Sequence, residues 1–406
     1  MNKLDDDLIT NSNNHRTMPI SKTKSYEEIN AKIKKGKAVI LTAEEVATMS
    51  RELSPKQILR KVDIVTTATF GAMCSSGAFL NLGHSNPPMR MERLTLNGVS
   101  AYGGIAAVDA YIGATQESPE NSRYGGAHVI QELIEGKDIL LEAWGKGTDC
   151  YPRQYIKTLI NKDSINEAYL FNPRNAYQNY NVAVNTTPYE IHTYMGTLAP
   201  NMGNATYSTT GELSPLLKDP DMRAIGIGTR VFIGGTQGFV AWQGTQFNTS
   251  KPKNSFGVPV NPAATLALIG DLKGMSSEFV KAAYFTGYGI TLFMGIGIPI
   301  PILDEDIAKA VCVRNDQIET CIYDYGKHDR PMLGRVTYAQ LRSGNIVVNG
   351  KSIKTTALSS LTKARQIASL LRLEIKEGRF ELNAPVQLFP TNTDVKGLVE
   401  REPHTY

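Results

Sequence analysis

Short apolar runs alternate with amphipathic stretches along the first part of the chain, and turn residues separate them. Residues 25–35 place apolar side chains on one helical face behind a serine and an acidic first turn, and Gly36 ends this pattern. The apolar run 38–41 predicts a short strand, and residues 42–45 have the spacing of a capping box that begins another helix. The β-branched run 62–67 predicts a second strand. This alternation of helices and strands predicts an α/β fold.

The same alternation continues toward the C-terminus. Residues 125–135 predict a helix, and residues 138–144 predict a strand. Two strand-like runs surround Asn349-Gly350, which is a strong type I′ hairpin signal, and residues 360–376 predict an amphipathic helix. Because no linker rich in Pro, Gly or Ser interrupts this pattern, we expect one large domain. It should contain one or more mixed sheets, flanking helices and Gly-rich loops at strand ends.

Two segments rich in glycine need a separate interpretation. Residues 282–303 lack charge over the length of a membrane span, but their glycines and prolines disfavour a helix, so we expect a buried strand-and-turn unit. Residues 223–246 alternate glycine with β-branched residues. No helix signal follows these glycines, so two packed strands joined by a glycine turn are favoured over a phosphate-binding loop.

The ends of the chain differ in pattern from the rest. Residues 1–22 are polar and without periodicity, which predicts a disordered N-terminal tail. We expect the folded domain to span residues 23–392 and a C-terminal tail to cover residues 393–406. The first residues contain no apolar signal-peptide core, so a cytoplasmic protein with reduced thiols is expected.

Composition excludes several functional classes. Hydrophobic residues make up 41% and charged residues 20% of the 406, as in an ordinary globular protein. The formal net charge of +4 is too small and too evenly spread to indicate nucleic acid as a partner. The four cysteines form neither a disulfide framework nor a metal-binding spacing, so we expect no metal site.

Two of the cysteines lie in glycine-rich loops that follow predicted strands. Cys74 stands among small and hydroxyl-bearing residues, and Cys150 stands between Lys146 and Arg153, whose charges favour a thiolate. The carboxyl ends of strands are where α/β proteins commonly place their chemistry. We therefore expect thiol or sulfur chemistry, although the sequence leaves open whether the two strands are neighbours.

Several motifs, taken together, resemble the homocysteine biosynthesis family, formerly a domain of unknown function. Its members include archaeal L-aspartate semialdehyde sulfurtransferases. The resemblance extends from about residue 26 to residue 390. The matching segments are residues 62–67, 74–85, 146–153, 228–230, 244–246, 269–273, 285–289, 324–326, 330–331 and 341–344.

The resemblance implies an enzyme that joins sulfide, or a bound sulfane sulfur, to L-aspartate semialdehyde and reduces the adduct to L-homocysteine. It maps the two cysteines that such enzymes require onto Cys74 and Cys150, and it leaves Cys312 and Cys321 outside the shared motifs. Family members carry an iron–sulfur module or work with a separate ferredoxin-like protein. The cysteines of this chain cannot hold a cluster. We therefore expect no bound cofactor, and two electrons supplied by a separate ferredoxin-like iron–sulfur protein.

The expected chemistry sets a geometric condition. A persulfide on one thiol, with Cys150 favoured, attacks the aldehyde, and the other thiol closes a disulfide that an external reductant reopens. The two Cα atoms must then lie within about 7 Å of each other. Candidate substrate-binding residues, each with an equally ordinary structural role, are Ser75, Ser76, His84, Arg90, Lys146 and Arg153. The oligomeric state is open, with a homo-oligomer included.

Two other classes of protein fit the same residues. One is a non-catalytic sulfur carrier or thiol-redox binding protein, and the other is a glycine-rich protein whose thiols are structural. A persulfide that aspartate semialdehyde discharges would indicate the enzyme, whereas a persulfide that persists would indicate the carrier.

Overall fold

Local capping signals set the helix boundaries in the computed structural model, which describes residues 24–175 and 178–401. Ser25, Thr42 and Ser54 each begin a helix with a reciprocal capping box. The helices are α1 (Tyr26–Lys34), α2 (Ala43–Met49), α3 (Pro55–Lys61), α4 (Gly126–Ile134), α5 (Pro215–Lys218), α6 (Glu305–Val311), α7 (Tyr338–Arg342) and α8 (Leu361–Lys376), with short 3₁₀ turns η1 (Pro200–Met202), η2 (Gly211–Leu213) and η3 (Leu272–Gly274).

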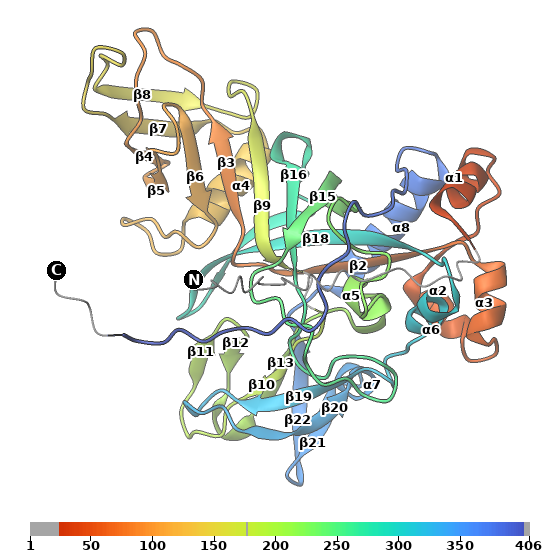
Figure 1. The fold of residues 1–406 in the computed structure, drawn as a ribbon. Coiled ribbons are helices and arrows are strands. Elements are labelled where there is room, and N and C mark those ends of the chain that lie inside the picture. The colour runs from red at the N-terminus through yellow and green to blue at the C-terminus, as the bar shows by residue number, and fades with distance from the viewer. Residues whose placement is uncertain (1–23, 176–177, 402–406) are drawn as a thin grey trace, which may run out of the picture.

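A large mixed sheet forms the upper lobe in Figure 1. Within the described residues it has fourteen strands, and β17 (Val280–Phe285) pairs only with β18. The other strands, in spatial order, are β1 (Ile40–Thr42), β2 (Ile64–Ala72), β18 (Gly289–Pro301), β14 (Arg230–Ile233), β15 (Thr236–Gln243), β16 (Leu266–Asp271), β9 (Ala168–Asn175), β3 (Gly77–Asn81), β6 (Asp109–Gly113), β5 (Val99–Tyr102), β4 (Arg93–Leu96), β7 (Ile139–Trp144) and β8 (Tyr155–Ile160).

A smaller mixed sheet forms the lower lobe, with its own apolar core. Its strands, in spatial order, are β20 (Met332–Thr337), β19 (Glu319–Asp324), β10 (Val182–Val184), β13 (Asn204–Tyr207), β22 (Lys351–Ala357) and β21 (Asn345–Val348). A hairpin of β11 (Ile191–Thr193) and β12 (Gly196–Leu198) lies beside it. The chain passes repeatedly between the lobes, so neither is a separate segment of sequence.

The structure confirms the predicted α/β class, with mixed sheets and flanking helices. The uncharged segment 282–303 lies mainly in the β17–β18 hairpin, and almost all of β18 is buried. The glycine-rich segment 223–246 contains β14 and β15, which pair around Gly234-Gly235. The predicted hairpin at Asn349-Gly350 joins β21 to β22, with both turn residues at positive φ.

The Cys74 loop closes a curl in the large sheet. Residues 73–76 connect β2 directly to β3, although six steps of the strand order separate these two strands. Six steps of a flat sheet would span about 29 Å. The five Cα-to-Cα steps from Ala72 to Gly77 reach at most about 18 Å. The sheet must therefore bend back on itself, and Cys74 lies where its two parts meet.

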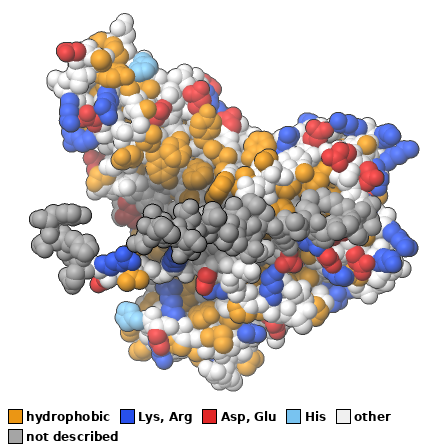
Figure 2. All heavy atoms as spheres, in the orientation of Figure 1, with side chains coloured by type: hydrophobic (Ala, Val, Ile, Leu, Met, Phe, Trp, Pro, Cys, Tyr) orange, Lys and Arg blue, Asp and Glu red, His pale blue; other side chains and the backbone are white. Residues whose placement is uncertain are grey.

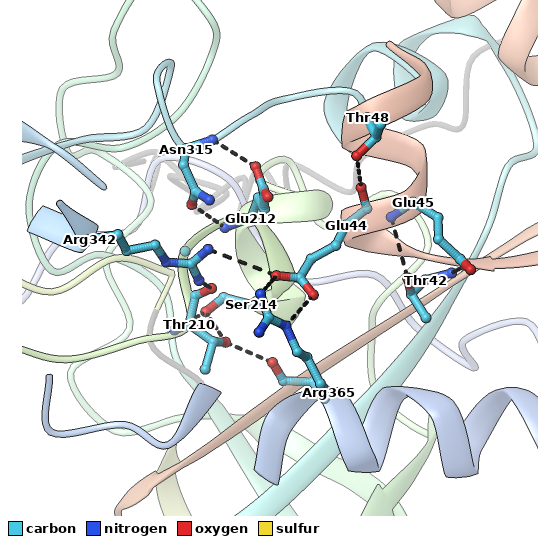
Figure 3. A network of polar contacts seen from close by, with 12 residues as sticks. Thr42, Glu44, Glu45, Thr48, Thr210, Glu212, Ser214, Asn315, Arg342 and Arg365 are labelled. Atoms are coloured by element: carbon cyan, nitrogen blue, oxygen red, sulfur yellow. Dashed lines mark hydrogen bonds and ion pairs between the residues drawn. The ribbon is translucent and has the colours of Figure 1, made fainter. Parts of the chain in front are cut away.

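An ionic and hydrogen-bonded network joins helices of both lobes (Figure 3). Glu44 on α2 accepts from Arg365 on α8 at 2.7 and 2.9 Å, and it lies 3.9 Å from Arg342 on α7. Arg342 also donates to the Thr210 carbonyl. Because α7 packs with the smaller sheet and α2 with the larger one, these contacts fix the lobes against each other.

The two ends of the chain differ in how much of them the structure describes. The predicted N-terminal tail, residues 1–22, lies outside the described residues. At the other end, the Thr393 carbonyl accepts a backbone hydrogen bond from Thr249 at 3.0 Å, and the Asp394 carboxylate accepts a side-chain hydrogen bond from the Asn248 amide at 2.5 Å. Protein contacts therefore continue just past residue 392.

Among the described residues, no helix combines the length and apolar character needed to cross a bilayer.

Candidate functional site

Cys74 is an exposed free thiol in the loop between β2 and β3. The neighbouring hydroxyls hold this loop in place. Ser76 is buried and donates to the Met73 carbonyl at 2.7 Å, while Ser75 donates to the Arg174 carbonyl at 3.1 Å. The two serines therefore direct their protons at backbone oxygens of the protein. The sequence left open whether Ser75 and Ser76 bind substrate or hold the loop, and these contacts hold the loop.

Gly77, which directly follows these serines, is required by close packing. A Cβ atom at this position would lie 2.1 Å from the hydroxyl oxygen of Tyr111, whose ring covers the start of β3. Only glycine allows that approach. Gly77, three residues after Cys74, therefore allows β3 to begin close against the Tyr111 ring.

Tyr288 is the aromatic partner of Cys74. Burial, together with the charge of the Cys74 thiol and a hydrogen bond to it, raises the pKa of Tyr288. The ring of Tyr194 lies 6.2 Å from that of Tyr288, and the Tyr194 hydroxyl lies 2.9 Å from that of Tyr325. Arg330 covers the Tyr325 ring at 4.4 Å. A protonated phenol is thus available to donate to the Cys74 sulfur.

A cavity of about 620 Å³ opens beside Cys74 between the two lobes. This volume is typical of small-molecule sites. Of the described residues, one cationic side chain, Arg174, and one anionic side chain, Glu117, line the cavity together with hydroxyl and aromatic groups. Arg174 is half-buried, and its Nε donates to Thr245 Oγ1 at 3.1 Å. A cation and an anion in one cavity suit a small zwitterionic ligand.

Cys150 lies elsewhere, in the loop between β7 and β8, and it is also exposed. The His84 ring stacks on that of Tyr151 with centroids 6.2 Å apart, and the Arg153 amide donates to the Pro88 carbonyl at 3.3 Å. A Cβ at Gly145 would lie 2.2 Å from the Arg90 carbonyl. The loops 84–90 and 145–154 therefore form one cluster. It brings together the predicted site residues His84, Arg90, Lys146, Cys150 and Arg153.

Both thiols follow the carboxyl end of a strand, as predicted, but one chain does not bring them together. Phe79 on β3 and Trp144 on β7 lie on the same cross-strand row, and the pairing makes β3 and β7 run in the same direction. Cys74 precedes Phe79 by five residues, and Cys150 follows Trp144 by six residues. The two thiols therefore lie beyond opposite ends of this part of the sheet.

The lateral offset adds to this separation. β7 lies four steps from β3 in the strand order, which corresponds to about 19 Å in a flat sheet. A disulfide requires Cα atoms within about 7 Å. The expected close approach of Cys74 and Cys150 is therefore not present within a single chain, and of the two only Cys74 lines the cavity. The predicted residues form two half-sites, one around each thiol.

The remaining cysteines have a structural environment. Cys312 and Cys321 are buried, and burial raises the pKa of Cys312 to about 11 and also raises that of Cys321. Thiols of this kind stay protonated and unreactive. Across residues 24–175 and 178–401, no group of three or more His, Cys, Asp or Glu side chains is placed to hold a metal ion.

Three residues of the cavity were missed by reasoning from sequence. Tyr288 lies in a segment that matches the family, but nothing local connects it to Cys74. Arg174 is the next-to-last residue of β9 and Glu117 follows β6, and both reach the cavity only because these strands flank β3. Their single available signal is a charged residue close to a strand end, which many surface residues share.

An exposed thiol beside a cavity that is lined by a positive and a negative side chain defines a thiol-containing small-molecule site on a mixed α/β fold. Comparison with known proteins gives the family. Residues 38–382 match the family model described as "Homocysteine biosynthesis enzyme, sulfur-incorporation". The chain therefore belongs to the homocysteine biosynthesis family of sulfur-incorporating enzymes.

Named relatives agree with this assignment. The chain is 50% identical over 382 residues to the L-aspartate semialdehyde sulfurtransferase of Methanosarcina acetivorans, covering 93% of this chain and 74% of the relative. It is 46% identical over 398 residues to the protein of the same name from Methanocaldococcus jannaschii, covering 94% and 74%. An uncharacterized protein of Methanothermobacter thermautotrophicus is 28% identical over 329 residues, covering 79% and 72%. No solved structure matches the chain.

Proposed function

We propose that this protein is an L-aspartate semialdehyde sulfurtransferase that makes L-homocysteine. The observation that carries the proposal is the exposed Cys74 thiol beside a cavity lined by one cation and one anion. L-aspartate semialdehyde has an α-carboxylate, an α-ammonium group and an aldehyde. We assign the carboxylate to Arg174 and the ammonium group to Glu117, which leaves the aldehyde for the sulfur.

The overall reaction consumes one aldehyde, one hydrogen sulfide, two electrons and two protons, and it yields the thiol and one water. The oxidised enzyme carries a disulfide between Cys74 and Cys150, which a thiol oxidant such as another disulfide forms once from the two free thiols and which each turnover regenerates. Sulfide opens this disulfide, which leaves a persulfide on one of the two cysteines, with Cys150 favoured, and a free thiol on the other. The outer sulfur adds to the aldehyde carbon. The second thiolate then attacks the inner sulfur, which reforms the disulfide and releases a 1-hydroxythiolate, RCH(OH)S⁻. Loss of water gives the thioaldehyde.

Reduction of the thioaldehyde completes the reaction. The two electrons and two protons come from an external reductant, for which we propose a separate ferredoxin-like iron–sulfur protein in the cytoplasm. Tyr288, which hydrogen-bonds to Cys74, stabilises its thiolate while that thiol is free. The disulfide steps require Cys150, which the fold holds away from Cys74 of the same chain.

A reconstitution assay tests this function. The purified protein is oxidised with diamide and freed of it, and is then incubated with L-aspartate semialdehyde, sulfide and a hydride donor that does not reduce disulfides. L-homocysteine is measured by mass spectrometry. We expect product from the wild type and none from Cys74→Ser or Cys150→Ser, while Cys312→Ala keeps the activity because that thiol is buried. A persulfide that the aldehyde does not discharge would instead support the sulfur-carrier alternative. Full activity in both serine variants would exclude the two-thiol chemistry.

A further inference from the structure

An uninterrupted row of mostly aromatic side chains crosses the outer face of the large sheet. Directly paired residues on neighbouring strands point to the same face. The pairing continues without a gap across seven strands, from β8 to β9. The row consists of Tyr155, Trp144, Arg93, Tyr102, Tyr111, Phe79 and Tyr169. Figure 2 shows hydrophobic side chains gathered on the face that carries β3, β6 and β9.

Much of this row is open to solvent. Tyr102 is 65% exposed, Tyr155 is 46% exposed and Tyr169 is 44% exposed. The rings contact one another, with centroids 4.8 Å apart for Phe79 and Tyr111, and Arg93 lies over the Trp144 ring at 5.7 Å. Contiguous exposed aromatic surface of this kind is typical of a protein interface.

The opposite face of the same strands is already covered. Ala78 and Leu80 of β3 point inward and are buried in one apolar core with Val129 and Leu133 of α4. Alternation along a strand therefore separates a packed face from an open aromatic face. Because the buried face already packs into the core of the fold, the aromatic face remains available to bind a partner.

The two half-sites lie at the two ends of this aromatic face. The cavity with Cys74 adjoins the ends of β3, β6 and β9 where residues 77, 113 and 174 lie. The Cys150 cluster follows the far end of β7. Each half-site has one thiol and lacks the other. A partner that covers the row and contributes the missing thiol would complete both sites.

We propose that a second copy of this chain packs on the aromatic face and that each active site combines Cys74 of one copy with Cys150 of the other. The two-fold axis would lie in the interface plane and pass through the midpoint of the line between the two thiols, at right angles to that line. Rotation about this axis exchanges the positions of the two thiols. Such an axis brings the Cys74 half-site of each copy against the Cys150 half-site of its partner. This inference deepens the proposed function and rests on it.

The dimensions of the face fit this occupant. From β8 to β9 the row spans six steps, or about 29 Å, and three outward levels along the strands add about 20 Å. The footprint is therefore about 600 Å², at the lower end of the roughly 600–1,000 Å² per partner of a standard protein interface. A two-fold dimer buries the same surface on both subunits, which suits a face with a complete half-site at each end.

Mixing two inactive variants tests the shared site. Cys74→Ser and Cys150→Ser subunits each lack one thiol, so no single chain in the mixture has both. If the sites form between subunits, random exchange makes half of the dimers mixed, and each mixed dimer has one complete site, so activity returns to about a quarter of wild type. If both thiols must come from one chain, the mixture stays inactive, and the proposal is wrong.

Two measurements remain informative even if no homocysteine is formed. Oxidation with diamide, which takes up the two thiol hydrogens, should give a disulfide-linked dimer in the wild type and in the mixture but not in either variant alone. Analytical ultracentrifugation should give twice the chain mass for the wild type. Tyr102→Arg should shift this to the monomer, whereas Val347→Arg, on an exposed strand of the smaller sheet, should not.

These outcomes separate the shared site from other uses of the face. A wild-type monomer whose aromatic face binds only an iron–sulfur protein would overturn the dimer. A dimer that shows neither complementation nor a cross-link between Cys74 and Cys150 would overturn the shared site. Homocysteine formation by a wild-type monomer would overturn this inference while leaving the proposed function intact.

Discussion

Replacing Arg174 with Gln tests how the substrate is oriented. Among the described residues the guanidinium makes one side-chain hydrogen bond, from Nε to Thr245 Oγ1 at 3.1 Å, so both terminal nitrogens remain for a two-pronged contact with a carboxylate. Hydrogen bonds between charged groups contribute about 1.5–3 kcal/mol each. The two bonds of the fork are worth about 3–6 kcal/mol, and Gln can still make one neutral hydrogen bond worth about 0.5–1.5 kcal/mol. The substitution should therefore cost about 2–5 kcal/mol, which is roughly a 30- to 5,000-fold decrease in kcat/KM for L-aspartate semialdehyde.

The assay compares two substrates. 3-Aminopropanal keeps the aldehyde and the amino group but lacks the α-carboxylate, so its kcat/KM should change less than about threefold in Arg174→Gln. Arg174→Lys, which keeps the charge without the planar fork, should fall between the wild type and Gln. Thr245→Val is the matched control, because it removes the contact to Nε and keeps the guanidinium.

A particular result would refute the reasoning. If Arg174→Gln lowers kcat/KM equally for both substrates, the side chain supports the fold or the reaction in general and does not bind the carboxylate. Unchanged kinetics with L-aspartate semialdehyde would remove Arg174 from the site. Thermal unfolding of each variant, followed by circular dichroism, shows whether the fold is intact.

Three further predictions concern single side chains. Tyr288→Phe removes the phenol beside Cys74 and should slow alkylation of Cys74 by iodoacetamide about tenfold in a Cys150→Ser background; an unchanged rate would mean that the phenol does not support the thiolate. Gly77→Ala should lower the free energy of unfolding by about 1–3 kcal/mol, because its Cβ would overlap the Tyr111 hydroxyl, whereas the control Gly397→Ala meets no atom within 4 Å and should be neutral. Lys218 is fully buried, donates to the Val311 carbonyl at 2.9 Å, and has a pKa lowered by burial to about 8. As the pH rises from about 8 to about 10.5, the folded state loses this proton before the unfolded state does, so stability should rise by up to about 3 kcal/mol, and urea titrations of Lys218→Met should not show this rise.

Local sequence signals were sufficient for many elements of the fold. The capping boxes at Ser25 and Thr42 begin helices α1 and α2 where the pattern places them. The Asn349-Gly350 turn joins two strands, and the C-terminal helix buries the expected face. These features depend on interactions between residues a few positions apart, so the order of amino acids is enough to specify them.

The chemistry of the site was only partly readable from the sequence. The glycine-rich loops at Cys74 and Cys150 follow strands and expose both thiols, as expected from their small and polar neighbours. The cavity partners of Cys74 were not readable, because Arg174, Glu117 and Tyr288 come from three other parts of the chain. Only the curl of the sheet brings them together.

The tertiary structure alone decided where the two thiols lie relative to each other. Their 76-residue separation in sequence is compatible with a disulfide or with opposite ends of a sheet. Strand order and register choose between these arrangements, and both are set by pairings between residues far apart in the chain. Amino-acid order therefore determined that this protein has two accessible thiols at strand ends, whereas long-range strand pairing separated them within one chain and left an aromatic face between them.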